Sequence, residues 1–308
     1  MKRSEAFKGP TEGRVKQGLH PRNRFRRGYD FAALTECAPV LAEHVRPNAH
    51  GADSIDYADP KAVKALNQAL LKHAYGVADW DIPKGYLCPP VPGRSDYLHH
   101  VADLLEDGME IPRGPDVRVL DVGTGANLIY PLVGTSEYGW RFVGSEIDPV
   151  ACQWACSLAE KQSSVRGLIE CRLQNHPAEC FRGVIREGER FDLTMCNPPF
   201  HRSAEDANEG SSRKRRHLKL DVPGRDQRNF GGQPNELWCE GGELGFIRRM
   251  IRQSVEFANR CGWFTTLVSK QDHLKPLEHE LQRVNVRGVR VIKMAQGQKQ
   301  SRILAWKF

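Results

Sequence analysis

The fold class of this 308-residue chain is decided by the stretch Val117-Arg118-Val119-Leu120-Asp121-Val122-Gly123-Thr124-Gly125-Ala126. Its first six residues form an apolar run of the length of a buried strand. The glycines that follow allow a tight turn and let the backbone approach a ligand without a Cβ atom in the way. Glu146 lies about twenty residues further on, at the end of the next expected strand, where an acidic residue can bind ribose hydroxyls. The stretch therefore predicts a strand that ends in a ligand-binding turn.

Short strands and helices alternate after Pro115. We expect helices over 149–162 and 243–259, and strands over 117–122, 140–146, 168–173, 192–196, 264–268, 289–294 and 303–308. This alternation predicts an α/β fold, with a twisted, mostly parallel sheet that carries helices on both faces.

The chain divides by composition into three segments. Residues 1–28 are rich in Arg, Lys, Gly and Pro, and are expected to form a disordered basic arm. Residues 29–92 are expected to form a small, partly helical RNA-binding module, with a helix over 62–71 and a proline-rich connector over 83–92. Residues 93–308 are expected to form the Rossmann-like domain.

The charge is basic and uneven. Lys and Arg number 45 against 38 Asp and Glu, which leaves a net charge of +7. Basic residues gather near the N-terminus and in a second run soon after residue 200. Such clusters favour a polyanionic partner, because a protein that neutralises phosphates releases their counterions. The candidate RNA contacts are Arg22, Arg24, Arg26, Arg27, Arg213, Lys214, Arg215 and Arg216.

The nine cysteines are scattered, and none forms a Cys-x-x-Cys pair. This pattern disfavours a disulfide framework and a metal site, and it favours the reducing cytoplasm. No apolar run approaches the ~20 residues that cross a bilayer, so we expect no membrane contact. Nothing in the sequence indicates an obligate protein partner.

The turn after the first strand suits one of two cofactor classes. A dinucleotide fingerprint calls for a third glycine near position 128, where this chain has Leu128. Asp121, two residues before Gly123, suits instead a cofactor with an amino-acid end and a cationic sulfonium. The expected cofactor is therefore S-adenosyl-L-methionine, held by Asp121, Gly123, Thr124, Gly125, Ala126 and Glu146.

A second motif, Asn197-Pro198-Pro199-Phe200, follows the expected strand 192–196. The Asn197 side-chain oxygen and the Pro198 carbonyl can both accept hydrogen bonds from one exocyclic amine. The prolines fix φ and bring no N–H donors of their own, and Phe200 offers a flat face for a planar base. The motif predicts methyl transfer to the nitrogen of a planar amine, with these four residues as the catalytic set. His201 is expected to pack or face solvent, rather than act as a base.

With both motifs, the chain resembles a class I S-adenosylmethionine-dependent methyltransferase, and more closely the bacterial large-subunit ribosomal RNA adenine-N6 methyltransferase F family. The resemblance covers nearly the whole chain. It is carried by residues 18–24, 80–83, 87–94, 125–127, 137–142, 196–201, 229–233, 236–243 and 294–302.

The resemblance implies methylation of the exocyclic N6 of one adenine in 23S rRNA, adenine 1618. It implies that 23S rRNA or a large-subunit assembly intermediate is the partner. It further implies that Arg94 binds the carboxylate of the cofactor, that Gln174 contacts its adenine, and that Asn197 also lies against the cofactor.

Several alternatives stay open from the residues alone. The Asn197 motif would also suit methylation of a guanine N2 amine or of a protein glutamine, although a glutamine substrate leaves the basic clusters without a purpose. A nicotinamide-dependent oxidoreductase is disfavoured by Leu128. An RNA-binding protein with an inactive methyltransferase fold is disfavoured by the intact Asp121, Glu146 and Asn197.

Overall fold

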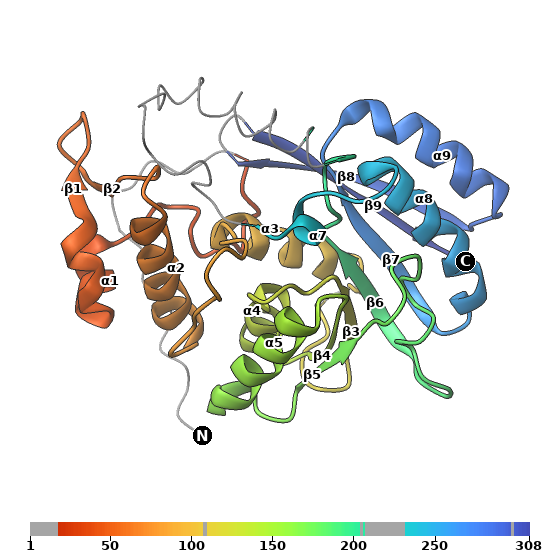
Figure 1. Ribbon diagram of the computed structural model, residues 1–308, viewed down its shortest axis with the longest axis horizontal. Coiled ribbons are helices and arrows are strands. Elements are labelled where there is room, and N and C mark those ends of the chain that lie inside the picture. The colour runs from red at the N-terminus through yellow and green to blue at the C-terminus, as the bar shows by residue number, and fades with distance from the viewer. Residues whose placement is uncertain (1–17, 107–109, 204–205, 207–231, 297–298) are drawn as a thin grey trace.

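The computed structural model describes residues 18–106, 110–203, 206, 232–296 and 299–308. Figure 1 shows a sheet with helices packed against it and a small group of elements at one side. The helices are α1 (Phe31–Cys37), α2 (Pro60–Tyr75), α3 (Val91–Ala102), α4 (Ile129–Tyr138), α5 (Pro149–Lys161), α7 (Pro234–Leu237), α8 (Gly242–Ser254) and α9 (Leu274–Arg283). The strands are β1 (Val45–Pro47), β2 (Asp53–Ile55), β3 (Arg118–Val122), β4 (Arg141–Glu146), β5 (Ile169–Leu173), β6 (Phe191–Cys196), β7 (Cys261–Val268), β8 (Gly288–Gln296) and β9 (Lys299–Lys307).

The main sheet has seven strands in the order β5-β4-β3-β6-β7-β9-β8. The first five in this order run parallel, and β9 pairs antiparallel with both β7 and β8. The order reverses between β3 and β6, since β4 and β5 lie on one side of β3 and the later strands on the other. In such sheets, ligands bind outside the carboxyl ends of the strands at the point of reversal.

Alternate residues of each strand face opposite sides of the sheet, so they pack into two separate hydrophobic cores. Val119 of β3 belongs to one core and its neighbour Leu120 to the other; Ile303 and Leu304 of β9 divide in the same way. Residues of α2 to α5 complete the first core, and residues of α8 and α9 complete the second. The sheet is therefore covered by helices on both faces, as the sequence predicts.

Local capping explains where the helices start. Asp59 accepts a hydrogen bond from Lys61 N ahead of α2, and Pro60 occupies the first turn. Asp148 caps α5 in the same way, again before a proline. Gly76 ends α2 in the left-handed conformation, with φ 66°, which glycine adopts at little cost.

The expected α/β fold is confirmed, and some element bounds differ. α3 begins at Val91, inside the expected connector 83–92, because Pro92 suits the first turn of a helix. The long helix expected over 243–259 ends at Ser254 and continues as a short 3₁₀ turn over Val255–Phe257. Among the described residues, no helix has the length and apolar character to span a membrane.

The expectation of a disordered arm over 1–28 is wrong for residues 18–28. Leu19 and Phe25 are buried, and Phe25 packs in the same core as α2 and α4. Asn23 donates from Nδ2 to Asp96 Oδ1 at 3.0 Å. A composition average over 28 residues hides these single apolar and amide side chains, which bind to elements far along the chain. Residues 1–17 lie outside the described residues.

Gly134 of α4 gives a test of the packing between α4 and the sheet. A Cβ atom at this position would lie 2.4 Å from Cζ of Phe142, which is buried in β4. We expect Gly134→Val to lower the free energy of unfolding by about 1–3 kcal/mol, the usual cost of overpacking. Urea denaturation measures it. Ser136→Ala, on the same helix, removes an atom and should change the free energy by less than about 0.5 kcal/mol.

Candidate functional site

A cavity of about 590 Å³ opens at the carboxyl edge of the sheet, where the strand order reverses. Its wall takes residues from the turn after β3, the ends of β4 and β6, the segment after β5, and α7. The sequence-predicted residues on this wall are Arg94, Gly123, Thr124, Gly125, Glu146, Gln174, Asn197, Pro198 and Pro199. Residues from five separate stretches of the chain thus meet at one place.

The turn after β3 is held against the end of β4. Gly123 and Gly125 have φ of 74° and 67°, a region that side chains with a Cβ rarely enter. Gly123 N and Thr124 N each donate to Ser145 O at 2.9 Å. Gly125 N donates to Glu146 Oε2 at 2.8 Å. The two glycines are therefore required for the conformation, and the turn is fixed to the carboxylate that the sequence placed at a ribose.

Glu146 is buried and bound by three backbone N–H groups. Besides Gly125, Ile147 N and Asp148 N donate to its Oε1 at 2.8 and 3.0 Å. Burial raises the pKa of Glu146, while these backbone donors act in the opposite direction. The donors stabilise the carboxylate form and fix its orientation at the cavity wall.

Asp121 lies at the end of β3 with its side chain fully buried. Among the described residues, neither of its carboxylate oxygens has a hydrogen-bond partner. Burial raises the pKa of Asp121 to about 7, and the nearby Thr124 hydroxyl and Arg94 charge act to lower it. A buried carboxylate without a partner is costly, so this position is prepared for a cation or donor that the described chain does not itself supply.

Arg94 comes from the first turn of α3 and reaches the same cavity. Its Nη1 donates to the Tyr130 hydroxyl at 2.8 Å, and its guanidinium carbon lies 5.5 Å from the centre of the Tyr130 ring. Tyr130 thus holds the guanidinium while leaving other N–H donors available. A fixed guanidinium at a cavity wall suits a carboxylate ligand.

The tetrapeptide after β6 carries an unused acceptor. Among the described residues, Asn197 Oδ1 is a buried atom with no hydrogen-bond partner. The end of β6, directly before Asn197, is held in place by the Tyr97 hydroxyl. This hydroxyl accepts a hydrogen bond from Cys196 N at 3.3 Å and forms another with Thr265 Oγ1 at 2.7 Å. A buried acceptor without a partner costs free energy, so Asn197 is positioned for a donor from a ligand.

Three predicted site residues lie outside the set that lines the cavity: Asp121, Ala126 and Phe200. Asp121 and Ala126 are buried within the turn, and Phe200 is half-buried beside the wall. Phe200 does not line the cavity in this structure, and its role as a base-stacking face stays a prediction. The predicted RNA contacts Arg213–Arg216 lie outside the described residues.

Two predicted RNA contacts are engaged inside the protein. Arg22 bonds Asp103 Oδ1 at 2.5 Å and His99 O at 2.8 Å. Arg24 bonds Glu137 Oε2 at 2.8 Å and Ala74 O at 2.9 Å. These bonds fasten the N-terminal segment to α2, α3 and α4, so the two arginines have a structural use. Their role as RNA contacts stays a prediction, as does that of Arg26 and Arg27.

His20, His100 and Asp103 have ligand atoms within 4.8 Å of one another, close enough to suit a cation. However, His20 Nδ1 accepts from Arg22 N at 3.1 Å, so the ring proton of neutral His20 sits on Nε2. That nitrogen lies 2.9 Å from Asp103 Oδ2 and donates to it. Because a protonated nitrogen cannot ligate a metal, we interpret His20 and Asp103 as a hydrogen-bonded pair that helps to secure residues 18–28.

Sequence reasoning missed the part of the cavity wall that comes from the segment before α8. Glu236 and Trp238 both line the cavity. Glu236 is the third residue of α7 and closes a capping box with Gln233. The Gln-x-x-Glu spacing was therefore a readable signal for the helix start. Nothing in the sequence connected this helix to the cavity.

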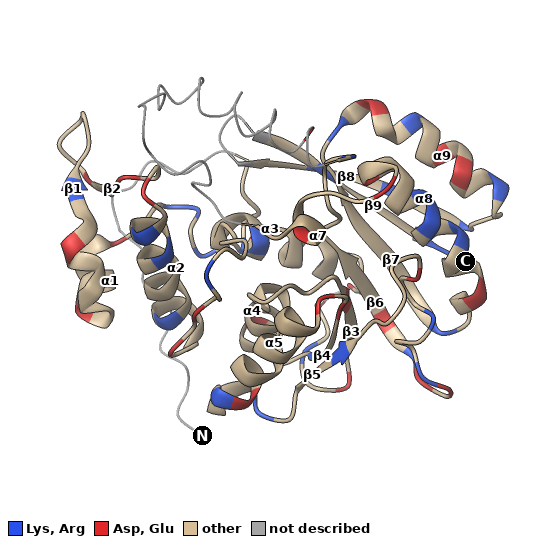
Figure 2. Cartoon of the chain, viewed as in Figure 1, with Lys and Arg blue, Asp and Glu red and all other residues tan. Residues whose placement is uncertain are grey.

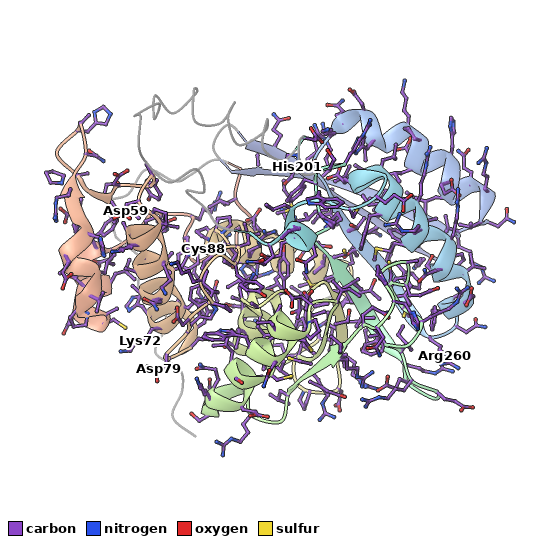
Figure 3. The ribbon with its side chains drawn as sticks, in the orientation of Figure 1. Asp59, Lys72, Asp79, Cys88, His201 and Arg260 are labelled. Carbon is purple, nitrogen blue, oxygen red and sulfur yellow. The ribbon has the colours of Figure 1, made fainter. Side chains whose placement is uncertain are left out.

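His201 joins the same segment to the end of β6. His201 N donates to Leu237 O at 3.0 Å, and Cys239 N donates to His201 O at 3.2 Å. Its ring Nδ1 lies 3.6 Å from Asp206 Oδ2. Figure 3 labels this side chain at the end of the sheet near α8. His201 is absent from the cavity lining, in keeping with the expectation that it is not a base.

Charges of both signs mix on the outer helices. Figure 2 shows Lys and Arg beside Asp and Glu on α8 and α9. Glu280 of α9 lies within ion-pair distance of Arg248, Arg252 and Arg283. Glu280 is buried while the side chains of the three arginines are exposed, so its carboxylate partly neutralises arginines on the outer face of these helices.

The whole chain is similar to known RNA methyltransferases. A family model described as RNA methyltransferase matches residues 13–308. The ribosomal RNA large subunit methyltransferase F of Aeromonas salmonicida is 57% identical over 299 residues, which cover 97% of this chain and 94% of that protein. The protein of the same name from Cytophaga hutchinsonii is 52% identical over 296 residues, 96% of this chain and 92% of its own length.

Solved structures of METTL16 domains are also similar to this chain. The human METTL16 catalytic domain in complex with MAT2A 3′UTR hairpin 1 is 31% identical, with a TM-score of 0.78 over 95% of this chain and 96% of that one. The N-terminal domain of human METTL16 in complex with SAH is 31% identical, with a TM-score of 0.73 over 94% of this chain and 98% of that one. Together with the family model, these relatives show that the chain belongs to the ribosomal RNA large subunit methyltransferase F family of RNA methyltransferases.

Proposed function

We propose that this protein transfers a methyl group from S-adenosyl-L-methionine to the exocyclic N6 of one adenine in 23S rRNA, adenine 1618 by family resemblance. The products are N6-methyladenosine and S-adenosylhomocysteine. The observation that carries the proposal is Asn197 Oδ1, a buried acceptor without a partner among the described residues, at the wall of the cavity beside β6. This acceptor lacks a hydrogen-bond donor, and an exocyclic amine brings two N–H groups, one for Asn197 Oδ1 and one for the Pro198 carbonyl, so the site fits a nitrogen substrate.

The residues of the cavity fit the methyl donor. Arg94 on the wall would bind its carboxylate, and the unpartnered Asp121, buried in the turn behind the wall, would balance the charge of its ammonium group. Glu146 would accept from the ribose, and Gln174 lies on the wall where the adenine would rest. When bound, S-adenosylmethionine supplies an electrophilic methyl group on a positively charged sulfur.

The chain itself positions the amine. Asn197 Oδ1 and the Pro198 carbonyl oxygen would accept the two N6 protons of an adenine that has left its stack. This draws the nitrogen lone pair out of conjugation with the ring and aims it at the methyl group. A nitrogen–carbon bond forms as the carbon–sulfur bond breaks, and one N6 proton passes to water. Orientation and electrostatics then carry most of the catalysis.

The RNA partner is proposed on separate grounds. The curated relatives are named for large-subunit ribosomal RNA, and one solved relative is a complex with an RNA hairpin. We propose 23S rRNA, free or in an assembly intermediate, as the substrate, with Arg26, Arg27 and Arg213–Arg216 among its contacts. The segment 29–92 is proposed to belong to the RNA-binding part, although it shares one continuous core with the sheet domain.

The test is to mix the purified protein, labelled methyl donor and 23S rRNA from a strain that lacks the enzyme, and to resolve the nucleosides of the product by mass. We expect label in N6-methyladenosine. Label in N2-methylguanosine would instead favour the guanine alternative, which the Asn197 clamp also suits. Absence of label from RNA would contradict the proposal.

A pH dependence of donor binding follows from Asp121. Burial raises the pKa of Asp121 to about 7, so the free protein is largely protonated there below this pH and ionised above it. If the ionised form pairs with the ligand ammonium, affinity for S-adenosylhomocysteine rises about tenfold per pH unit up to pH 7 and then levels off. Calorimetric titration between pH 5.5 and 8 measures it. Asp121→Asn should remove this dependence, and a slope that persists in the variant would contradict the assignment.

A further inference from the structure

The segment 232–239, which we call the strap, is hydrogen-bonded to the connector at one end and to the residues after β6 at the other. At one end, Gly232 N donates to Gly85 O at 2.7 Å in the connector. At the other end, the strap pairs with His201 after β6. Figure 1 shows α7, the helix of the strap, beside the carboxyl end of β6, in keeping with the pairing of Trp238 and His201. Four strap residues line the cavity besides Trp238: Pro234, Asn235, Glu236 and Cys239.

Glu146 alone has too few free lone pairs to bind a ribose diol. An ionised carboxylate offers about four acceptor positions, two on each oxygen. Glu146 Oε1 accepts from Ile147 N and Asp148 N, and Oε2 accepts from Gly125 N. About one position remains free. Two ribose hydroxyls bring two donors, so one of them requires another acceptor.

Glu236 has the free acceptor that Glu146 lacks. Its Oε2 accepts from Gln233 N at 2.8 Å and from Leu87 N at 3.1 Å, which holds the side chain in place. Its Oε1 accepts no hydrogen bond from the described residues. This oxygen lies 3.8 Å from the position that a Cβ atom of Gly125 would take. Gly125 is also the residue that donates to Glu146, so the two carboxylates lie near the same glycine.

The charges around Glu236 are consistent with a ligand hydroxyl between Glu236 and Glu146. Burial raises the pKa of Glu236, and the charges of Glu146 and Asp148 raise it further. Two carboxylates that face one cavity repel each other. Hydroxyl donors placed between them would reduce that repulsion, and the described part of the wall brings no cation into contact with Glu236 Oε1.

We propose that Glu236 binds the ribose of the methyl donor, accepting from one hydroxyl while Glu146 accepts from the other. This assignment rests on the proposed function. It makes the strap part of the donor site. Leu87 N and Gln233 N fix Oε2 of Glu236 before a ligand binds. The Glu236 side chain therefore loses no further conformational freedom when its Oε1 accepts a hydrogen bond from the ligand.

The test measures binding of S-adenosylhomocysteine and of its 2′-deoxy and 3′-deoxy analogues by calorimetry. Glu236→Gln keeps an oxygen for Leu87 N and Gln233 N and places an amide at the cavity. We expect it to weaken binding of S-adenosylhomocysteine about tenfold, the effect of losing a charged hydrogen bond. For one of the two deoxy analogues, native and variant protein should bind within about twofold of each other. Glu240→Gln removes a carboxylate from the same wall and should change every affinity by less than about twofold.

Three results would overturn the assignment. The variant could bind S-adenosylhomocysteine as tightly as the native protein, which would overturn the assignment alone. The tenfold loss could persist with both deoxy analogues, which would show that Glu236 acts by holding the strap and not by binding a hydroxyl. A native protein that fails to bind S-adenosylhomocysteine would overturn the proposed function and the assignment together.

Discussion

Asn197→Ala is expected to lower the rate of methyl transfer by about 10³-fold, the upper range for loss of one preorganised hydrogen-bonding group in an active site. The variant loses the buried Oδ1 that has no other partner among the described residues. The amine of the target would then keep its lone pair in conjugation and lose its orientation. Single-turnover kinetics with saturating RNA measures the chemical step directly.

The affinity of Asn197→Ala for S-adenosylhomocysteine should stay within about threefold of native, because the lost contact belongs mainly to the target. Asn235 lines the same cavity and provides the matched control. Asn235→Ala should keep the rate within about threefold. Near-native turnover by Asn197→Ala would refute the amine clamp.

Arg94→Leu is expected to weaken binding of S-adenosylhomocysteine by about 100-fold. This is the loss that follows when one member of a buried charge pair is removed. The guanidinium faces the cavity and is held by the Tyr130 hydroxyl at 2.8 Å. Calorimetric titration gives the dissociation constants, and the kcat at saturating donor should change far less than the affinity.

A ligand without the amino-acid end separates the role of Arg94 from a general disturbance of the cavity. Methylthioadenosine lacks the carboxylate, so native protein and Arg94→Leu should bind it within about twofold of each other. Arg249 lies on the same wall, and Arg249→Leu should leave the affinity for S-adenosylhomocysteine within about fivefold. A loss for methylthioadenosine as large as for S-adenosylhomocysteine would contradict the carboxylate assignment.

The sequence predicted those parts of the fold that depend on local pattern. The run 117–122 reads as a buried strand because apolar side chains occur on both of its faces, and β3 is indeed covered by both cores. Gly123 and Gly125 mark the turn because only glycine adopts their φ values at low cost. Asn197 was found because its motif is contiguous and stands directly after a strand.

The parts that the sequence did not reveal depend on contacts between distant segments. Glu236 reaches the cavity through a hydrogen bond from Leu87, which is 149 residues away. Arg22 and Arg24 look like solvated charges in a basic segment, yet their partners lie on α2, α3 and α4. Local periodicity carries no information on such pairs, so the assignment of these arginines to RNA depended on charge and on the family resemblance at residues 18–24.

The central claim is that one cavity holds the methyl donor beside the Asn197 acceptor. The most direct measurement is a crystal structure of the protein with S-adenosylhomocysteine. The account predicts ligand density in this cavity, with the carboxylate at Arg94, the ribose between Glu146 and Glu236, and the sulfur directed towards Asn197. Density for the ligand elsewhere, or reversed so that its adenine lies at Arg94, would contradict the account.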